Sequence, residues 1–109
     1  MAEKMLIIII SGEKDKTKAM IGLNLANHLN DETRVILFGE SEKLAASGDA
    51  EITGLIKKLQ EKGVIPIACS GYAENNKIDG ILKEMKLEIK PISSVIADYV
   101  KNGYTPITF

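Results

Sequence analysis

The chain has 109 residues, 45% of them hydrophobic and 27% charged, with a formal net charge of -1, one cysteine and one histidine. This length and apolar content are typical of one ordinary domain, so we expect residues 1–109 to fold as a single unit. The balanced charge excludes a general attraction to nucleic acid or to an anionic membrane. A lone cysteine excludes an internal disulfide and argues against a structural zinc site, so we expect no metal.

An apolar run near the N-terminus, residues 5–10, could be mistaken for a targeting segment. It is too short to span a bilayer, and no small-residue cleavage site follows it. The run MLIIII is continuously apolar and rich in β-branched residues, which is typical of a parallel strand covered on both faces. We therefore expect a buried strand and no membrane partner. Because a lone thiol suits a reducing compartment, we also expect a cytoplasmic protein.

The next elements alternate between helix and strand. A broad apolar stripe over residues 19–29 predicts a helix, with Asp15 as its N-cap. The sequence TRVILFG then predicts a second strand that runs through Phe38, and SEKLAAS predicts a short helix that Gly48 ends. The polar loop SGEKDK, which separates the first strand from the first helix, therefore lies at the carboxyl end of a strand.

The second half of the chain continues this alternation. Apolar residues at i, i+3, i+4 and i+7 over residues 52–59 predict the clearest helix. The sequence VIPIA predicts the third strand, although Pro66 would remove one donor from the sheet. Apolar residues over 78–85 predict another helix, with Asn76 and Asp79 as a capping-box-like pair.

The C-terminal elements complete the predicted sheet. The sequence LEIKP predicts a short strand of the edge type, and Ser93 or Ser94 is expected to cap a last helix that ends at Gly103. The residues TPITF predict a terminal strand. Strands that alternate with helices at short spacing imply right-handed crossovers, so we expect a three-layer α/β/α fold with a five-stranded, mainly parallel sheet.

In sheets of this kind ligands bind at the carboxyl ends of the strands, which here lead into loops at Ser11, Gly39 and Cys69. The first loop lacks a Walker sequence and a GxGxxG motif, and its two acidic side chains would repel a phosphate group. A phosphoacceptor domain would need an aspartate where Ala68 and Cys69 end the third strand. A flavin or nucleotide binder is therefore the weakest hypothesis, and we expect no cofactor.

Cys69 follows an apolar strand and precedes the small and polar residues SGYAENN. If the next helix begins near Tyr72, its amides would favour the thiolate; if it begins near Lys77, they would help less. Cysteine is also among the most buried residue types, so an inert packing role stays open. Without a histidine or aspartate at a recognisable spacing, the loop suits attack on a sulfur–sulfur bond better than hydrolysis.

Four segments together resemble the DsrE/DsrF-like sulfur-relay family, which includes the sulfur-carrier subunits of the Tus and Dsr complexes. They are SGEKDKTKAMIGLNLA after the first strand, the strand end at Phe38 and Gly39, the segment IKKLQEKGVIPIAC, and the closing ADYVKNGYTPITF. The resemblance implies a parallel α/β subunit that assembles into trimers or hexamers. It also implies a cysteine that carries sulfane sulfur as a persulfide, and Cys69 occupies that position.

The leading hypothesis is therefore a sulfur relay in which Cys69 accepts sulfur from a donor protein and passes it to an acceptor protein. Whether the chain counts as a sulfurtransferase enzyme is left open. We expect six residues to surround the sulfur: Ser70, Gly71, Tyr72, Ser11, Gly12 and Glu13. The alternative is a non-catalytic oligomeric scaffold or small-molecule-binding module of the same fold, in which the cysteine is inert.

Overall fold

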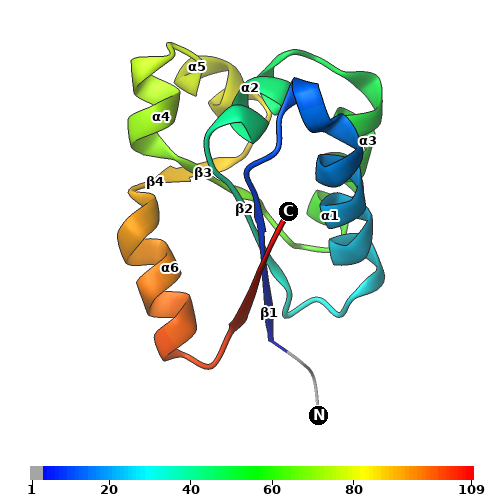
Figure 1. Ribbon diagram of the computed structural model, residues 1–109, viewed down its shortest axis with the longest axis vertical. Helices are drawn as coiled ribbons and strands as arrows, with labels where there is room; N and C mark the ends of the chain where they lie inside the picture. The colour runs from blue at the N-terminus through cyan, green and yellow to red at the C-terminus, as the bar shows by residue number, and fades with distance from the viewer. Residues whose placement is uncertain (1–3) are drawn as a thin grey trace.

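The computed structural model describes residues 4–109 and contains one five-stranded parallel sheet (Figure 1). The strands are β1 (Met5–Ile9), β2 (Arg34–Leu37), β3 (Ile67–Cys69), β4 (Glu88–Lys90) and β5 (Thr105–Thr108). Their order across the sheet is β4-β3-β2-β1-β5, and every neighbouring pair is parallel. The expected α/β/α fold is confirmed, and β4 is an edge strand as its sequence predicts.

Helices connect the strands and cover the two faces of the sheet. They are the short 3-10 helix η1 (Glu13–Asp15), α1 (Lys16–His28), α2 (Glu40–Ala46), α3 (Ala50–Glu61), α4 (Ser70–Asn75), α5 (Asp79–Glu84) and α6 (Ile92–Lys101). Figure 1 shows α1 and α3 together on one side of the strands and α6 on the other. Within residues 4–109, no helix is both long enough and apolar enough to cross a bilayer.

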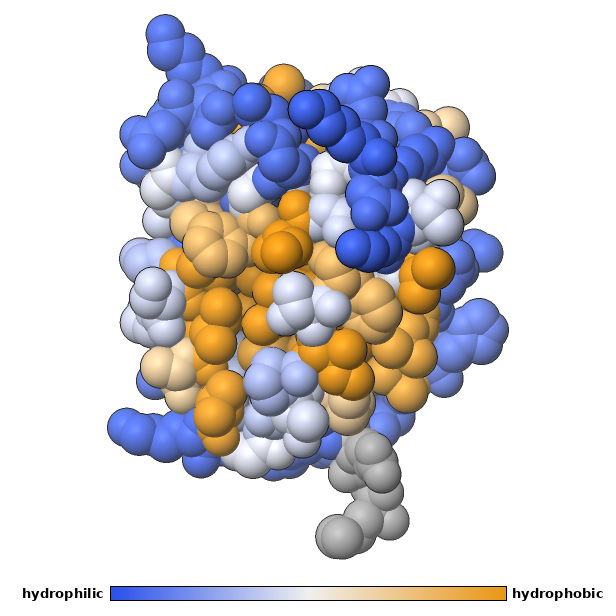
Figure 2. Space-filling view, in the orientation of Figure 1, coloured by the Kyte–Doolittle hydropathy of each residue, from blue (hydrophilic) through white to orange (hydrophobic). Residues whose placement is uncertain are grey.

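The two faces of the sheet are covered unequally. On one face, Ile7 and Ile9 of β1 belong to a large core that includes residues of α1, α2, α3 and α5. On the other face, Leu6 and Ile8 belong to a smaller cluster. The helical residues of this cluster all come from α6. Figure 2 shows apolar residues gathered across the middle of the molecule beside β5, between α6 and α1. We call the face packed against α6 the thinly covered face.

Several local expectations differ from the structure. One helix was expected to begin near Tyr72 or near Lys77, but two short helices, α4 and α5, occupy this stretch. Asn76 ends α4 instead of capping α5, whose N-cap position is Ile78. The third strand begins after Pro66, so the missing proline amide does not interrupt its pairing. Asp15 does stand at the N-cap position of α1, but its side chain makes no capping hydrogen bond there.

The expected serine cap of the last helix is also wrong. Ser93 and Ser94 lie inside the first turn of α6, and the N-cap position belongs to Pro91. The hydroxyl of Ser94 donates a hydrogen bond back to the carbonyl oxygen of Pro91 at 3.1 Å. Pro91 fixes its own φ near the value needed to enter a helix, so α6 begins two or three residues earlier than the serines indicate.

Candidate functional site

Cys69 is the last residue of β3 and stands at the N-cap position of α4. The chain therefore turns from strand to helix at the cysteine itself, without an intervening loop. The side chain is half-buried and packs against the cluster on the thinly covered face. In register, Cys69 pairs with Lys90 of the edge strand β4. Cys69 thus lies at the carboxyl edge of the sheet, and the residue is partly exposed.

The three residues after the cysteine form the first turn of α4, so this helix begins before Tyr72. Gly71 is exposed, and a Cβ placed on it would lie 4.0 Å from Sγ of Cys69. Tyr72 is half-buried, and the Nζ atom of Lys43 on α2 lies 6.0 Å from the centre of its ring. Burial, and then the negative charge of Glu40, raises the pKa of the Tyr72 phenol. The tyrosine therefore connects the cysteine turn to α2.

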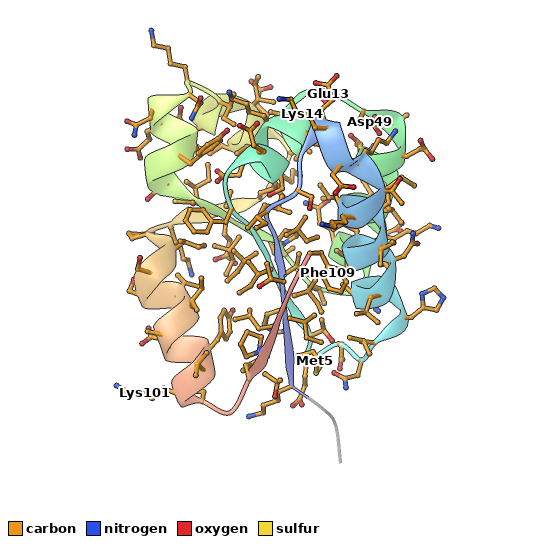
Figure 3. The ribbon with its side chains drawn as sticks, viewed as in Figure 1. Met5, Glu13, Lys14, Asp49, Lys101 and Phe109 are labelled. Atoms are coloured by element: carbon orange, nitrogen blue, oxygen red, sulfur yellow. The ribbon has the colours of Figure 1, made fainter. Side chains whose placement is uncertain are left out.

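The loop after β1 reaches the same edge of the sheet but contacts α2. Gly12 is buried, and a Cβ on it would lie only 2.6 Å from the Cβ of Glu40. A hollow of about 300 Å³ opens beside this contact and is lined by Gly12, Glu13, Lys14 and Glu40. Figure 3 shows Glu13 and Lys14 at that end of the molecule. Cys69 does not line this hollow, so the expected roles of Ser11, Gly12 and Glu13 at the sulfur stay predictions.

The first turn of α2 ties the ends of β1 and β2 together, and its residues were not among the predicted site residues. The hydroxyl of Ser41 donates to the carbonyl oxygen of Ile9 at the end of β1. It also accepts the amide hydrogen of Phe38, 3.0 Å away, just after β2. Next to it, the Oε2 atom of Glu42 accepts the amide hydrogen of Gly39 at 2.9 Å. Gly39 has a φ of +83°, a backbone conformation that favours glycine.

Glu42 is fully buried, with a relative exposure of 0%. Burial raises the pKa of its carboxyl group from 4.5 to about 7, and the amides of Gly39 and Cys69 partly oppose this rise. Its Oε1 atom has no hydrogen-bond partner of standard geometry. The site therefore contains a buried carboxylate beside the backbone of the candidate nucleophile. The sequence signal for it is a glutamate three residues after Gly39, which is half of a capping box.

Three solved structures resemble this chain over nearly its whole length. The protein of unknown function BT1422 from Bacteroides thetaiotaomicron has a TM-score of 0.78 and 22% identity, over 97% of this chain and 95% of its own. The E. coli ychN protein has a TM-score of 0.74 and 16% identity, over 98% and 99%. The protein of unknown function MTH1491 from Methanobacterium thermoautotrophicum has a TM-score of 0.75 and 19% identity, over 98% and 100%.

The chain has the fold of these three proteins. Their sequence identities to it are 16 to 22%, so the likeness concerns the arrangement of helices and strands and not the site. Neither a family model nor a curated protein sequence matches the chain. The function must therefore be argued from the residues themselves.

Proposed function

We propose that the chain is a sulfur-relay protein of the DsrE/DsrF-like type that carries sulfane sulfur as a persulfide on Cys69. One observation carries the proposal: the lone cysteine is only half-buried at the carboxyl end of β3, on the thinly covered face. A thiol at this position can meet a second protein, whereas a core cysteine cannot. The whole-chain likeness in fold and the sequence resemblance of four segments support the same family.

The proposed chemistry consists of two exchange steps without net oxidation or reduction. In the first step the Cys69 thiolate attacks the outer sulfur of a donor persulfide. A new sulfur–sulfur bond forms to Cys69, and the donor's sulfur–sulfur bond breaks and releases the donor as a thiolate. In the second step an acceptor thiolate attacks the outer sulfur on Cys69 in the same way. The acceptor leaves as a persulfide, and the Cys69 thiolate is restored.

The surrounding residues have supporting roles in this proposal. The amides of Ser70, Gly71 and Tyr72 lie in the first turn of α4, where a helix leaves amides without partners of its own. These amides donate to the bound sulfur. The exposed Gly71 leaves space beside Sγ for the added sulfur atom. Because the carrier thiol must stay reduced between turnovers, the proposal places the protein in the cytoplasm.

The proposal includes assembly of several copies, as the family resemblance implies. Ile10 and Phe38 continue β1 and β2 by one residue and are 49% and 40% exposed. By strand alternation they lie on the same face as Ile8, Ile36 and Cys69. Large exposed apolar residues grouped in this way are typical of protein interfaces. We propose that this face packs against a second copy in a trimer or hexamer.

Sedimentation velocity tests the assembly. The unchanged protein should sediment as a trimer or hexamer, and Phe38→Asp should reduce it to smaller species. Ile81→Asp is the matched control, because Ile81 is exposed to a similar extent, 45%, but belongs to α5 on the other side of the sheet. A monomer at all concentrations would contradict this part of the proposal.

The intact mass of the protein tests the carrier role. Incubation of the native protein with glutathione persulfide should add one sulfur atom to each chain, and Cys69→Ser should gain none. A tryptic digest should place the added sulfur on the peptide that contains Cys69. No addition with this donor, or with an enzymatic persulfide donor, would remove the proposal.

One observation favours a second candidate function. Cys69 packs partly against the cluster formed by Leu6, Ile8, Ile36, Ile67 and Ile92, as an inert cysteine would. In that case the chain is a scaffold or a small-molecule-binding module of the same fold. Titration of the thiol distinguishes the two functions, because an inert cysteine reacts only after unfolding, whereas a carrier reacts in the native protein.

A further inference from the structure

A groove between α3 and α5 lies on the face of the sheet opposite the thinly covered one, away from Cys69. Its volume of about 470 Å³ is within the range of small-molecule pockets. The end of α2 forms part of its lining. At one end the side-chain amide of Gln60 on α3 donates a hydrogen bond to the carbonyl oxygen of Met85, 2.9 Å away, just after α5. A hollow of about 60 Å³ continues the groove to this bond, so that end is closed.

Apolar and small residues line most of the groove. Ala50 and Gly54 contribute from α3, and Ile81 and Met85 from the other side. Ile81 is 45% exposed. Gly54 lies in the middle of α3, where glycine is less favourable than alanine, yet a Cβ on it would meet no atom within 4 Å. Packing within the chain therefore does not require this glycine, and its missing side chain leaves space for another molecule.

One positive charge stands in this apolar groove. Lys57 is the charged residue among those described that line it, and it is exposed. None of the ion pairs within residues 4–109 involves Lys57. Thr53, one turn earlier on the same side of α3, adds a hydroxyl group to the lining. A carboxylate placed here would accept hydrogen bonds from the ammonium and from the hydroxyl group.

We propose that the groove binds a small amphipathic carboxylate, of the class of medium-chain fatty acids. The carboxylate binds Lys57 near the closed end, and the apolar chain lies along Gly54, Ala50 and Ile81. Ala50 and Lys57 are seven residues apart on α3, which corresponds to about 10 Å along the helix axis and sets the length of the chain. The inference does not depend on the sulfur relay, because Cys69 does not line the groove.

Calorimetric titration with sodium decanoate tests the inference, since the extended decanoate chain has a similar length. Decyltrimethylammonium is the matched probe, because it has the same apolar chain and the opposite charge. Both are kept below the concentrations at which they form micelles. Decanoate should bind once per chain and at least fivefold more tightly than the cation. In nuclear magnetic resonance spectra, decanoate should shift the methyl groups of Ile81 and Met85 and the amide of Gly54.

Variants separate the charge from the space. Lys57→Met should weaken decanoate binding about fivefold, the size expected for one exposed ion pair. Lys58→Met is the control, because Lys58 is the next residue, is also exposed and does not line the groove. Gly54→Leu fills the groove and should abolish binding. If Gly54→Leu fails to fold, Gly54→Ala should still weaken binding, although it strengthens the helix.

Four results would overturn the inference. They are no binding of decanoate, equal binding of decanoate and the cation, unchanged binding in folded Gly54→Leu, and shifts centred on the exposed Ile10 and Phe38 instead of the groove. Sedimentation velocity adds a fifth. If Ile81→Asp dissociates an assembly of the chain, a second copy covers the groove and the carboxylate does not. Each of these results leaves the persulfide test of Cys69 unaffected.

Discussion

The buried Glu42 makes a quantitative prediction about stability and pH. Its pKa is about 7 in the folded protein, raised mainly by burial from 4.5, the value expected when the chain is unfolded. Between these two values the folded state holds a proton that the unfolded state has lost, so the stability falls as the pH rises. Below about pH 4.5 both states are protonated and the stabilising effect of the neutral form is fully present. Above about pH 7 it is lost.

Glu42→Gln removes this dependence, because the amide resembles the protonated acid and does not titrate. One pKa unit corresponds to about 1.4 kcal/mol, so a rise from 4.5 to about 7 corresponds to about 3 kcal/mol. At about pH 5 the variant should be nearly as stable as the unchanged protein. At about pH 8 it should be more stable by about 3 kcal/mol, the effect of no longer burying a charge.

Urea unfolding followed by circular dichroism measures the difference in stability between Glu42→Gln and the unchanged protein across the pH range. The protein concentration is held constant, because assembly makes stability depend on concentration. Both proteins contain all the other titratable groups, so the effects of those groups cancel when the two stabilities are compared at each pH. Glu40→Gln is the control, because it makes the same change at an exposed position in the same turn of α2. Parallel curves for Glu42→Gln and the unchanged protein would refute the argument from burial.

Two further predictions concern packing and backbone conformation. Ile36→Ala should lower the free energy of unfolding in urea by about 2–5 kcal/mol, because Ile36 is fully buried in β2; exposed Ile21→Ala should change it by less than about 1 kcal/mol. Gly39→Ala should lower it by about 1–3 kcal/mol through its φ of +83° alone, since a Cβ there meets no neighbour. Gly54→Ala in α3, also in open space, should raise it by about 0.5–1 kcal/mol. Equal effects within either pair would contradict the reasoning.

The sequence predicted those elements whose residues carry a local signal. The continuous apolar run of β1 reflects burial on both faces, and the spacing of Ile52, Leu55, Ile56 and Leu59 reflects the one buried side of α3. The helix α4 has six residues and one buried side chain, so no periodic pattern marks it. Its position depends on β3, which lies before it, and on contacts with α5.

The candidate site was predictable only in part, because its residues meet through contacts distant in sequence. Cys69 could be placed at the end of a strand from the apolar residues before it. The burial of Glu42 could not be predicted from the sequence, since a glutamate in a short helix is usually solvated. It is buried because the ends of β2 and β3 meet beneath α2 and because the amide of Gly39 donates a hydrogen bond to it there. The thinly covered face is the one on which α6 packs. The sequence of α6 does not indicate which face of the sheet this helix covers, so this feature could not be predicted either.

The most direct test of the account is a single turnover of the relay. The protein is loaded with labelled sulfur from a persulfide donor, freed of the donor, and mixed with glutathione, and the masses of both products are recorded. One labelled sulfur atom should leave Cys69 of each chain and appear as glutathione persulfide, while the protein returns to its unloaded mass. Sulfur that never loads, or that stays on Cys69 in the presence of the acceptor, would contradict the central claim.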